Sequence, residues 1–447
     1  MRRSVLVAAV LVIVAVAGAV AYQTAARERD YRALLARGDS ALRDDQTFGA
    51  IEAYSGAMAL HPDSMLAHLR RGETYQRRGE LDEAARDFRT AAALDPTATR
   101  PLEALGDVLY QLQRFDRAAE TYANDLRLDD RSATVSYKLA LAKYRSGDCD
   151  SALTTLATTV RLNDRLADPQ YLMGLCLQQR HRNAEAIQAF EKAVSLAPGL
   201  LPAREELADL YAAAGRHAEE LDELQMIATL DRDHIERQVA LGLAQARTGH
   251  EELAVLTLGN ALTSNPDQPL VYRALGQVWL DRAQAHNDRV FLSKSLEALA
   301  RVASGPTATS DVLTLYGQAL LLDGQIDLAE RAFEQACARY PVEPSSLVLY
   351  ATAAERQARL DAARQALIDY TGLVSDDSEL VAQAAHIAAL SMKLNDPRAA
   401  VRWLQRASEK APDDAHLATA LADAQLKLAA LERRQADTAN AGPASGQ

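Results

Sequence analysis

Cysteine, glycine, proline and aromatic residues are all scarce in this chain. Its 447 residues include three cysteines, Cys149, Cys176 and Cys337, and these form no C-x-x-C motif. An odd number of scattered cysteines cannot supply a disulfide framework that holds a fold together. With 21 glycines, 14 prolines and almost no segment of alternating polar and apolar residues, the chain does not have the pattern of a β protein. Its abundant Ala, Leu and Arg residues instead predict an all-α fold.

The chain also lacks the charge and the motifs of several functional classes. Its net charge is −12 and it has no long basic run, so it is poorly suited to neutralise the phosphates of a nucleic acid. We find no G-x-x-x-x-G-K-[ST], G-x-G-x-x-G, G-x-S-x-G or H-E-x-x-H motif, and the segment HEELA at His250 lacks a second histidine. We therefore expect no enzymatic activity, no cofactor, no metal site and no small-molecule substrate.

The first 23 residues differ from the rest, because residues 4–22 are apolar and uncharged. A helix of this length, at ~1.5 Å per residue, nearly spans the ~30 Å hydrocarbon core of a bilayer. We therefore expect residues 1–23 to form one membrane-spanning anchor. The alternative is a cleaved signal peptide with an apolar core over residues 5–16 and a processing site at Ala17–Ala19 or Ala19–Ala21.

Arginines on both sides of the apolar run bear on its orientation. Arg2 and Arg3 favour a cytoplasmic N-terminus, which places the rest of the chain on the periplasmic side of a bacterial inner membrane. Arg27, Arg29 and Arg32 argue for the opposite orientation. If the segment is cleaved, the protein is instead secreted or periplasmic. Residues 24–30 are expected to continue the helix as a short linker.

The remainder of the sequence repeats itself with a period of 34 residues. The segment from Gly79 to Pro96, GELDEAARDFRTAAALDP, returns as GQIDLAERAFEQACARYP from Gly324 to Pro341. The repeats begin near residues 31, 65, 99, 133, 167, 201, 235, 269, 310, 344 and 381. We number the places within a repeat from its first residue. Small residues recur at the eighth and twentieth places: Gly38, Gly72, Gly106, Gly174, Gly242, Gly276 and Gly317, and Ala50, Ala84, Ala118, Ala186, Ala254 and Ala329.

This spacing predicts two antiparallel helices in each repeat. Glycine or alanine at the eighth and twentieth places allows the two backbones to approach closely where the helices cross. Acids such as Asp82, Asp150 and Asp327 fall at the start of second helices, where they suit the helix dipole and can cap free N–H groups. The period breaks once, and we place the seven extra residues in DRAQAHNDR, residues 281–289, as a tolerated loop.

The period, the small residues, the aromatic places and the closing prolines together resemble the tetratricopeptide repeat family, over residues 31–414. The resemblance implies an α-solenoid of about eleven stacked helix-turn-helix repeats, wound as a right-handed superhelix with first helices lining its concave side. Residues 415–435 are expected to form a capping helix and residues 436–447 a disordered tail. The Lys and Asn clamp with which some members hold chaperone C-termini is absent, since Glu103 and Asp107 occupy two of its places.

The candidate binding residues are those expected to face the groove at the fifth, ninth and twelfth places of first helices. We expect an apolar, tyrosine-lined patch between two acidic shoulders, suited to a partner segment with apolar anchors and basic flanks. The alternative is that Tyr137 and Tyr171 pack on neighbouring helices and bind nothing. The patch comprises Tyr137, Leu141, Tyr144, Tyr171, Leu175 and Gln178, and the shoulders comprise Glu103, Asp107, Glu205 and Asp209.

These features predict a protein-binding scaffold tethered to a membrane through residues 4–22. Its partners are expected to be proteins that dock in the concave groove, and a role in cell-envelope assembly, secretion or export follows by analogy with anchored repeat proteins. The alternative is an exported soluble protein whose groove holds a polysaccharide or another polymer.

Overall fold

The computed structural model describes residues 2–264 and 266–440, without the side chains of residues 2–10, 12, 264 and 437–440. The described residues form 23 α-helices and no strand, so the prediction of an all-α chain is confirmed. The helices group into two compact parts, an N-terminal part of residues 1–215 and a C-terminal part of residues 216–447.

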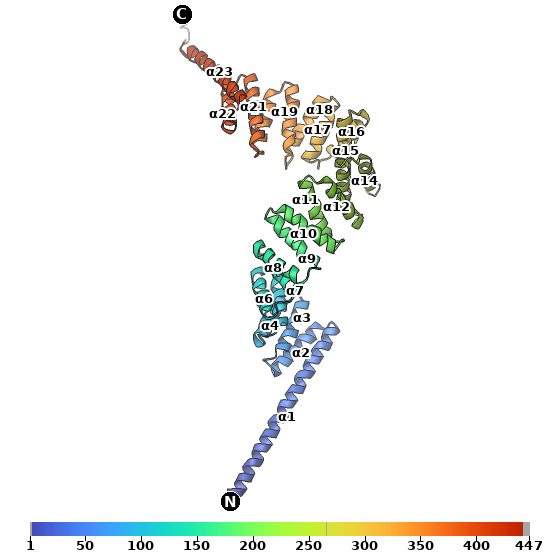
Figure 1. Cartoon of the computed structure of the whole chain (residues 1–447), viewed down its shortest axis with the longest axis vertical. Coiled ribbons are helices and arrows are strands. Elements are labelled where there is room, and N and C mark those ends of the chain that lie inside the picture. Colours follow the sequence, from blue (N-terminus) through green and yellow to red (C-terminus); the bar gives the residue numbers. More distant parts are fainter. Residues whose placement is uncertain (1, 265, 441–447) are drawn as a thin grey trace. The chain divides into compact units, whose positions relative to one another are not determined.

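The N-terminal part consists of helical hairpins that stack in chain order (Figure 1). From α1 to α10, each odd-numbered helix packs against the next even-numbered helix, and each even-numbered helix packs against the odd-numbered helix that follows it. Its helices are α1 (Arg2–Arg43), α2 (Thr47–Leu60), α3 (Met65–Arg77), α4 (Leu81–Leu94), α5 (Thr99–Gln111), α6 (Phe115–Leu128), α7 (Ala133–Arg145), α8 (Cys149–Leu162), α9 (Ala167–Gln179), α10 (Asn183–Leu196) and α11 (Leu201–Ala213).

The C-terminal part is built in the same way. After α12, five hairpins follow one another, and the last helix, α23, packs on α22. Its helices are α12 (His217–Leu230), α13 (Ile235–Arg247), α14 (Glu251–Ser264), α15 (Pro269–His286), α16 (Arg289–Ala303), α17 (Ser310–Leu322), α18 (Ile326–Cys337), α19 (Pro344–Arg356), α20 (Leu360–Thr371), α21 (Asp377–Lys393), α22 (Pro397–Lys410) and α23 (Ala415–Asn440).

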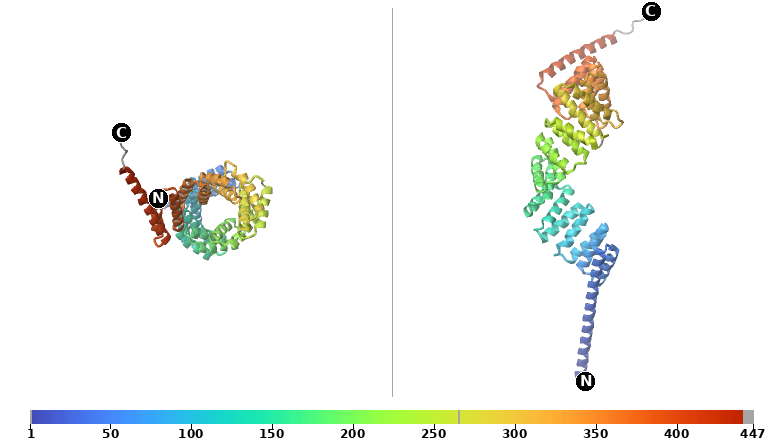
Figure 2. Two further views of the ribbon diagram at one scale, coloured as in Figure 1. Left: turned by 90° about the horizontal axis from the view of Figure 1, so that it is seen from above. Right: turned by 90° about the vertical axis from the view of Figure 1, so that its right-hand side faces the viewer.

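The N-terminal apolar segment lies in α1, a single helix that runs without a break into the first hairpin (Figure 2). In the described part of the chain, no helix has a stretch that is both apolar and long enough to cross a bilayer, so the expected membrane-spanning helix is not supported. The expectation for residues 4–22 falls partly outside the described residues, because the side chains of residues 4–10 and 12 are among those left out.

Small residues lie where the two helices of a hairpin cross. Ala50, Ala84, Ala118, Ala186, Ala254 and Ala329 are completely buried. The glycines of the eighth place leave no room for a side chain, because an added Cβ would lie 2.4 Å from a ring carbon of Tyr54 at Gly38 and 2.4 Å from Phe190 at Gly174. The same contact would be 2.7 Å at Gly72, 2.4 Å at Gly106, 2.7 Å at Gly242, 2.5 Å at Gly276 and 2.5 Å at Gly317.

The residue opposite the eighth place decides how small that place must be. Wherever the second helix carries an aromatic ring at the twenty-fourth place, as at Phe88 and Phe190, the eighth place is glycine. Alanine occurs at the eighth place only opposite the shorter leucine, as in the buried pair Ala140 and Leu156. Gly242 and Gly276 also stand opposite leucines, so an aromatic ring requires glycine at the eighth place, whereas leucine is found opposite either glycine or alanine.

The acids at the start of the second helices do not cap their own helices. Side-chain caps come instead from residues such as Ser64 and Asp148. Asp82 accepts a hydrogen bond from Arg114 of the next repeat at 3.1 Å, and Asp150 and Asp327 bind Arg180 and Gln357 in the same way, each at 2.5 Å. The predicted capping role is therefore wrong, and these acids join consecutive repeats.

Three boundaries differ from the sequence prediction. The expected loop at residues 281–289 is helical as far as His286, because α15 has 18 residues where most first helices have 13. α21, the first helix of the last repeat, begins at Asp377 rather than near residue 381. Asp376 caps this helix by accepting a hydrogen bond from the backbone N–H of Glu379. α23 continues to Asn440, past the expected start of a tail at residue 436, because the first helix breakers follow it; residues 441–447 lie outside the described residues.

Candidate functional site

Ion pairs connect the first helices of the first four repeats. Each pair joins an acid at the ninth place to a cation of the next repeat. Arg70 on α3 lies 3.8 Å from Asp39 on α1, and Arg100 on α5 lies 2.6 Å from Glu73 on α3. Lys138 on α7 continues this ladder to α5, as described below. The ninth-place acids of α1, α3 and α5 are thereby each paired with a cation of the next repeat.

The ladder stops at α7 and α9, where the ninth place is Leu141 or Leu175 instead of an acid. The fifth place of both helices is tyrosine. Tyr137, Leu141, Tyr144 and Leu175 pack, each partly exposed, against one buried cluster that includes Leu156. Three predicted anchors on α7 and one on α9 are thereby brought together on one surface.

The second tyrosine packs against the next hairpin. The ring of Tyr171 lies 5.7 Å from that of Phe190, centroid to centroid, and Tyr171 and Leu175 both contact the cluster around Phe190. Tyr171 nevertheless stays partly exposed, as does Gln178 two turns further along α9. Tyr137 and Tyr171 therefore each pack partly on neighbouring helices, as the alternative predicted. The rest of each side chain remains accessible to a partner.

Electrostatic effects show which groups surround these rings. Burial raises the pKa of Tyr137 to about 12, with further contributions from Asp168, Tyr110 and Tyr171. Burial also raises the pKa of Tyr171, and the next largest contribution comes from Glu206. We call Tyr110, Tyr137, Tyr144 and Tyr171 the tyrosine cluster.

Tyr144 connects the tyrosine cluster to two buried cysteines, Cys149 and Cys176. Burial raises the pKa of the Tyr144 hydroxyl, followed by the effects of Cys176, Cys149 and Glu206. Cys149 and Cys176 are free thiols on α8 and α9, and burial raises the pKa of Cys176 to about 12. The floor beneath Tyr144 is therefore apolar, and Glu206 on α11 is the carboxylate that contributes most to the raised pKa of Tyr144.

The first predicted acidic shoulder is neutralised. Lys138 Nζ lies 2.8 Å from Glu103 Oε1 and 2.8 Å from Asp107 Oδ2, and Asp107 also accepts a hydrogen bond from Tyr122. Lys138 was missed because it occupies the sixth place of its repeat, next to the fifth place from which the groove was predicted. Glu103 and Asp107 are thus occupied by a cation of their own chain.

The second shoulder has a different composition from the predicted one. Glu205 and Asp209 are exposed on α11, and both have partners within the chain. Glu206, which was also missed because it stands at the sixth place, acts on both Tyr144 and Tyr171. Glu206 and Asp168 make no ion pair within the described residues.

This surface offers aromatic faces, apolar side chains and two carboxylates. Among the side chains that the structure describes, no three His, Cys, Asp or Glu residues lie close enough to hold a metal ion. The arrangement is suited to burying an apolar side chain and pairing with a cation, which are contacts of recognition.

Two family models, both described as tetratricopeptide repeat, match the chain. One matches residues 137–200 and 315–377, and the other matches residues 65–98. A comparison with curated proteins gives no match.

Three solved structures that resemble the chain are distant from it in sequence. YrrB, described as a TPR protein with an unusual peptide-binding site, is 21% identical and has a TM-score of 0.37, with 42% of this chain and 97% of that chain covered. PilF of Pseudomonas aeruginosa is 20% identical with a TM-score of 0.38 and coverages of 46% and 94%. Yeast Tom70 is 14% identical with a TM-score of 0.42 and coverages of 84% and 99%. Likenesses at this level carry no argument about function.

The family models agree with the 34-residue period in each of the three segments that they match. The first segment covers the hairpin α3–α4, and the second begins at Tyr137 and includes most of the tyrosine cluster. The chain therefore contains tetratricopeptide repeats.

Proposed function

We propose that this chain is a non-enzymatic scaffold that docks partner proteins, and that the tyrosine cluster is its main docking surface. The observation that carries this proposal is the interruption of the ion-pair ladder. Acids and cations of consecutive first helices satisfy one another as far as α7, whereas Tyr137 and Tyr171 on α7 and α9 present partly exposed rings. Aromatic rings bury a large area with little loss of entropy and are common anchors of interfaces.

The chemistry around the rings specifies the partner. The proposed ligand segment places an apolar side chain on the tyrosines and a lysine or arginine near Glu206 and Asp168, which make no ion pair within the described residues. A basic flank on the other side has no counterpart, because Lys138 already occupies Glu103 and Asp107. The proposed partner is therefore basic on one side of its anchor only.

The test is site-specific crosslinking in the native host. A photoreactive amino acid at Gln178 should capture a defined partner, and the double substitution Tyr137→Ala and Tyr171→Ala should remove that product. The matched control is Tyr316→Ala with Tyr350→Ala, since these tyrosines are also partly buried on first helices and 34 residues apart. Capture that survives loss of Tyr137 and Tyr171 would show that the cluster is not the docking surface.

We further propose that residues 4–22 attach the scaffold to a bacterial inner membrane, with the repeats on the periplasmic side. The support is the exposure of Leu11, Ile13, Val14 and Val16 on α1, whose side chains are 57–65% exposed. An apolar surface of this kind is stabilised by lipid, and attachment raises the effective concentration of partners at the membrane. Retention in membranes after a carbonate wash is expected, together with release when Val14 and Val16 are both changed to Arg.

The alternative is an exported soluble protein that binds a polysaccharide or another polymer. Mass spectrometry of the mature N-terminus separates the two. Intact Arg2 or Arg3 supports the anchor, whereas a start near Val20 or Tyr22 supports the exported protein. The docking proposal for the tyrosine cluster does not depend on this outcome, because the cluster lies in residues 110–171.

A further inference from the structure

Two of the three cysteines of the chain meet between consecutive repeats. Cys149 is the first residue of α8, and Cys176 lies near the C-terminal end of α9, which packs on α8. Cys149 Sγ lies 3.0 Å from Oε1 of Gln179, which follows Cys176 by about one helical turn. Both thiols belong to the buried cluster against which Tyr144 packs. The two side chains therefore share one contact between α8 and α9.

The repeat itself brings these two side chains together. Cys149 stands at the seventeenth place of the fourth repeat, and Cys176 stands at the tenth place of the fifth. Two repeats earlier the same two places hold Leu81 and Val108, which pack in one apolar cluster. The contact is thus a regular feature of the stack, and at this junction two cysteines replace two apolar side chains.

The two thiols also interact with each other. Burial raises the pKa of Cys176 to about 12, and the next causes are the charge of Cys149 and a hydrogen bond with its thiol. Both cysteines are free thiols. A disulfide bond needs sulfurs ~2.05 Å apart, and rotation of both side chains about their Cα–Cβ bonds shortens the contact between them.

We propose that Cys149 and Cys176 form a disulfide bond that joins α8 to α9 when the chain folds in an oxidising compartment. The oxidant is itself a disulfide. The thiolate of one cysteine attacks it and releases one thiol, and the thiolate of the other then attacks the mixed disulfide and releases a second thiol. The two cysteines lose two protons and two electrons, which the two released thiols carry away.

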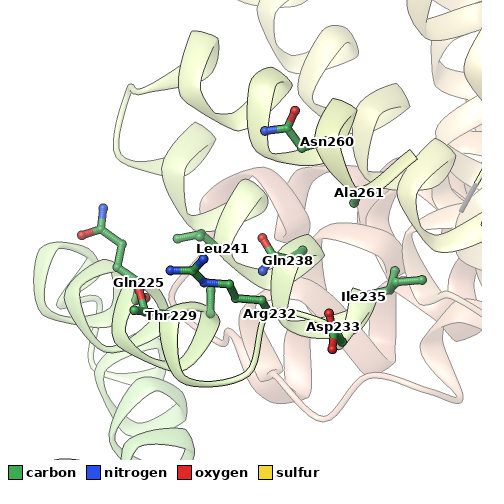
Figure 3. A pocket seen from close by; sticks show the side chains of 10 residues that line it. Gln225, Thr229, Arg232, Asp233, Ile235, Gln238, Leu241, Asn260 and Ala261 are labelled. Carbon is green, nitrogen blue, oxygen red and sulfur yellow. The ribbon is translucent and has the colours of Figure 1, made fainter. Parts of the chain in front are cut away.

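Burial determines when this bond can form. Cys149 and Cys176 are 1% and 0% exposed. A solute reaches side chains such as Gln225, Arg232 and Asn260, which are exposed around an open cleft of about 640 Å³ between α12, α13 and α14 (Figure 3). It does not reach thiols beneath packed helices, and few of these thiols are ionised. The bond therefore forms before α9 has packed on α8, and packing then protects it from reductants.

The bond holds the two halves of the tyrosine cluster together. α8 packs against α7, which carries Tyr137 and Tyr144, and α9 carries Tyr171. A cross-link between α8 and α9 disfavours opening of this junction, because it restricts the unfolded chain. The effect on docking rests on the proposed function, and the proposed periplasmic location supplies the oxidant. The formation of the bond by the purified chain depends on neither.

The test is refolding of the full chain from urea into a buffer of reduced and oxidised glutathione. Tryptic peptide mapping without reduction should show residues 146–161 joined to residues 166–180. Cys337 is the internal control, because its Sγ lies 3.6 Å from Ser346 Oγ on α19 and its peptide, residues 332–339, should join neither of the others. The folded, reduced chain placed in the same buffer should form the bond roughly tenfold more slowly or less, because its thiols are buried.

Amide hydrogen exchange measures the effect of the bond on the junction. Exchange in α8 and α9 should be roughly tenfold slower, or more, in the oxidised chain than in the reduced chain. Cys176→Ala should exchange alike in both buffers, whereas the matched control Cys337→Ala should respond as the parent does. Alanine fits at the tenth place, since the buried Ala142 occupies it in the fourth repeat.

Three outcomes would overturn the inference. They are a bond that involves Cys337, mixed disulfides with glutathione in place of the joined peptides, and equal exchange of α8 and α9 in the oxidised and reduced chains. None of these measurements uses a partner protein. Failure of the docking surface would therefore leave the bond in place, and the two failures can be distinguished.

Discussion

Gly174 and Phe190 fill one helix crossing, and their substitution tests the packing rule of the repeats. An alanine Cβ at Gly174 would lie 2.4 Å from the Phe190 ring. Overpacking at so short a contact costs roughly 2–3 kcal/mol, the upper part of the usual range, and the better helix propensity of alanine returns about 1 kcal/mol. Gly174→Ala should therefore lower the unfolding free energy by about 1–2 kcal/mol. Chemical denaturation followed by circular dichroism measures it.

The buried pair Ala140 and Leu156 shows that alanine at the eighth place fits opposite leucine, which suggests a control for Gly174→Ala. Since alanine is tolerated opposite leucine, Gly174→Ala should cost about 1 kcal/mol less in a Phe190→Leu background than in the parent. Gly199→Ala, at a glycine with no atom within 4 Å of the added Cβ, should change stability by no more than about 0.5 kcal/mol. Additive effects at Gly174 and Phe190 would refute the packing rule.

Asp125 makes stability depend on pH in an unusual direction. Its side chain is 1% exposed with one oxygen unpartnered, and burial raises its pKa from 3.8 to about 6, helped by Glu103 and Asp129 and opposed by Lys138. As the pH falls from 6 to 4, the folded state takes up a proton that the unfolded state does not yet bind. This group therefore stabilises the fold as the pH falls through that window.

Asp125→Asn removes the buried charge, so at pH 8 it should raise the unfolding free energy by about 2 kcal/mol. The advantage should disappear as the pH falls from 6 to 4. Urea denaturation at a series of pH values measures the difference from the parent. Asp130→Asn changes an exposed acid in the turn that follows α6 and should show no such trend. An advantage for Asp125→Asn that is constant from pH 4 to pH 8 would contradict the assignment.

At the scale of single residues, the sequence predicts the spacing of the small packing residues better than it predicts which side chains contact one another between repeats. The eighth-place glycines were found because each touches a residue of its own repeat at a fixed separation. The roles of Lys138, Glu206 and Arg114, the partner of Asp82, were not predicted. These side chains act between repeats, and which residue they contact depends on the length of the side chain as well as on the 34-residue period. The sequence did contain a signal for these ion pairs, because the partners are separated by nearly one repeat. Lys138 stands 31 residues from Asp107, and Arg114 stands 32 residues from Asp82.

Three consecutive helices of the N-terminal part are joined by one buried ionic network. Arg71 on α3 contacts Asp87 on α4 through two hydrogen bonds of 2.7 and 2.8 Å, and it donates to Ser55 on α2 at 3.0 Å. His68 lies 3.2 Å from the same carboxylate, which belongs to a residue that is 5% exposed. The network links α2 to the following hairpin as well as α3 to α4.

Arg71→Met should therefore destabilise the chain by about 3 kcal/mol, because it leaves the Asp87 charge buried with a weaker partner. Adding Asp87→Leu should recover most of that loss, since the uncompensated charge is then gone. Arg86→Met breaks an exposed pair with Glu83 and should cost less than about 0.5 kcal/mol. Equal losses for Arg71→Met and Arg86→Met, measured by denaturation, would show that burial does not set the value of the pair.

Element boundaries followed the sequence where the repeat is regular and departed from it where the repeat is not. The extra residues near Asp281 lengthen α15, since DRAQAH contains no glycine or proline to stop a helix and Asn287 takes the left-handed conformation that ends it.

For the whole molecule, the period alone was enough to predict an all-α chain of stacked hairpins, because each hairpin buries its apolar face only against its neighbours. It does not reveal the division into residues 1–215 and 216–447. The right-handed superhelix and the protein partners remain predictions. A period fixes the nearest neighbour of each repeat and nothing more distant.

This nearest-neighbour character makes a prediction about how damage spreads. Gly174 and Gly317 occupy the same place in repeats of different parts, and an added Cβ would meet Phe190 or Phe333 at 2.4 and 2.5 Å. Amide hydrogen exchange in Gly174→Ala should accelerate in α7–α11 and change less than about twofold in α19–α22, because stability in such arrays is a sum of local and neighbouring terms. Gly317→Ala should give the reverse pattern, accelerating α17–α20 and sparing α3–α6. Acceleration of all helices in both variants would mean that the array unfolds as one cooperative body, and the separate treatment of its two parts would then be wrong.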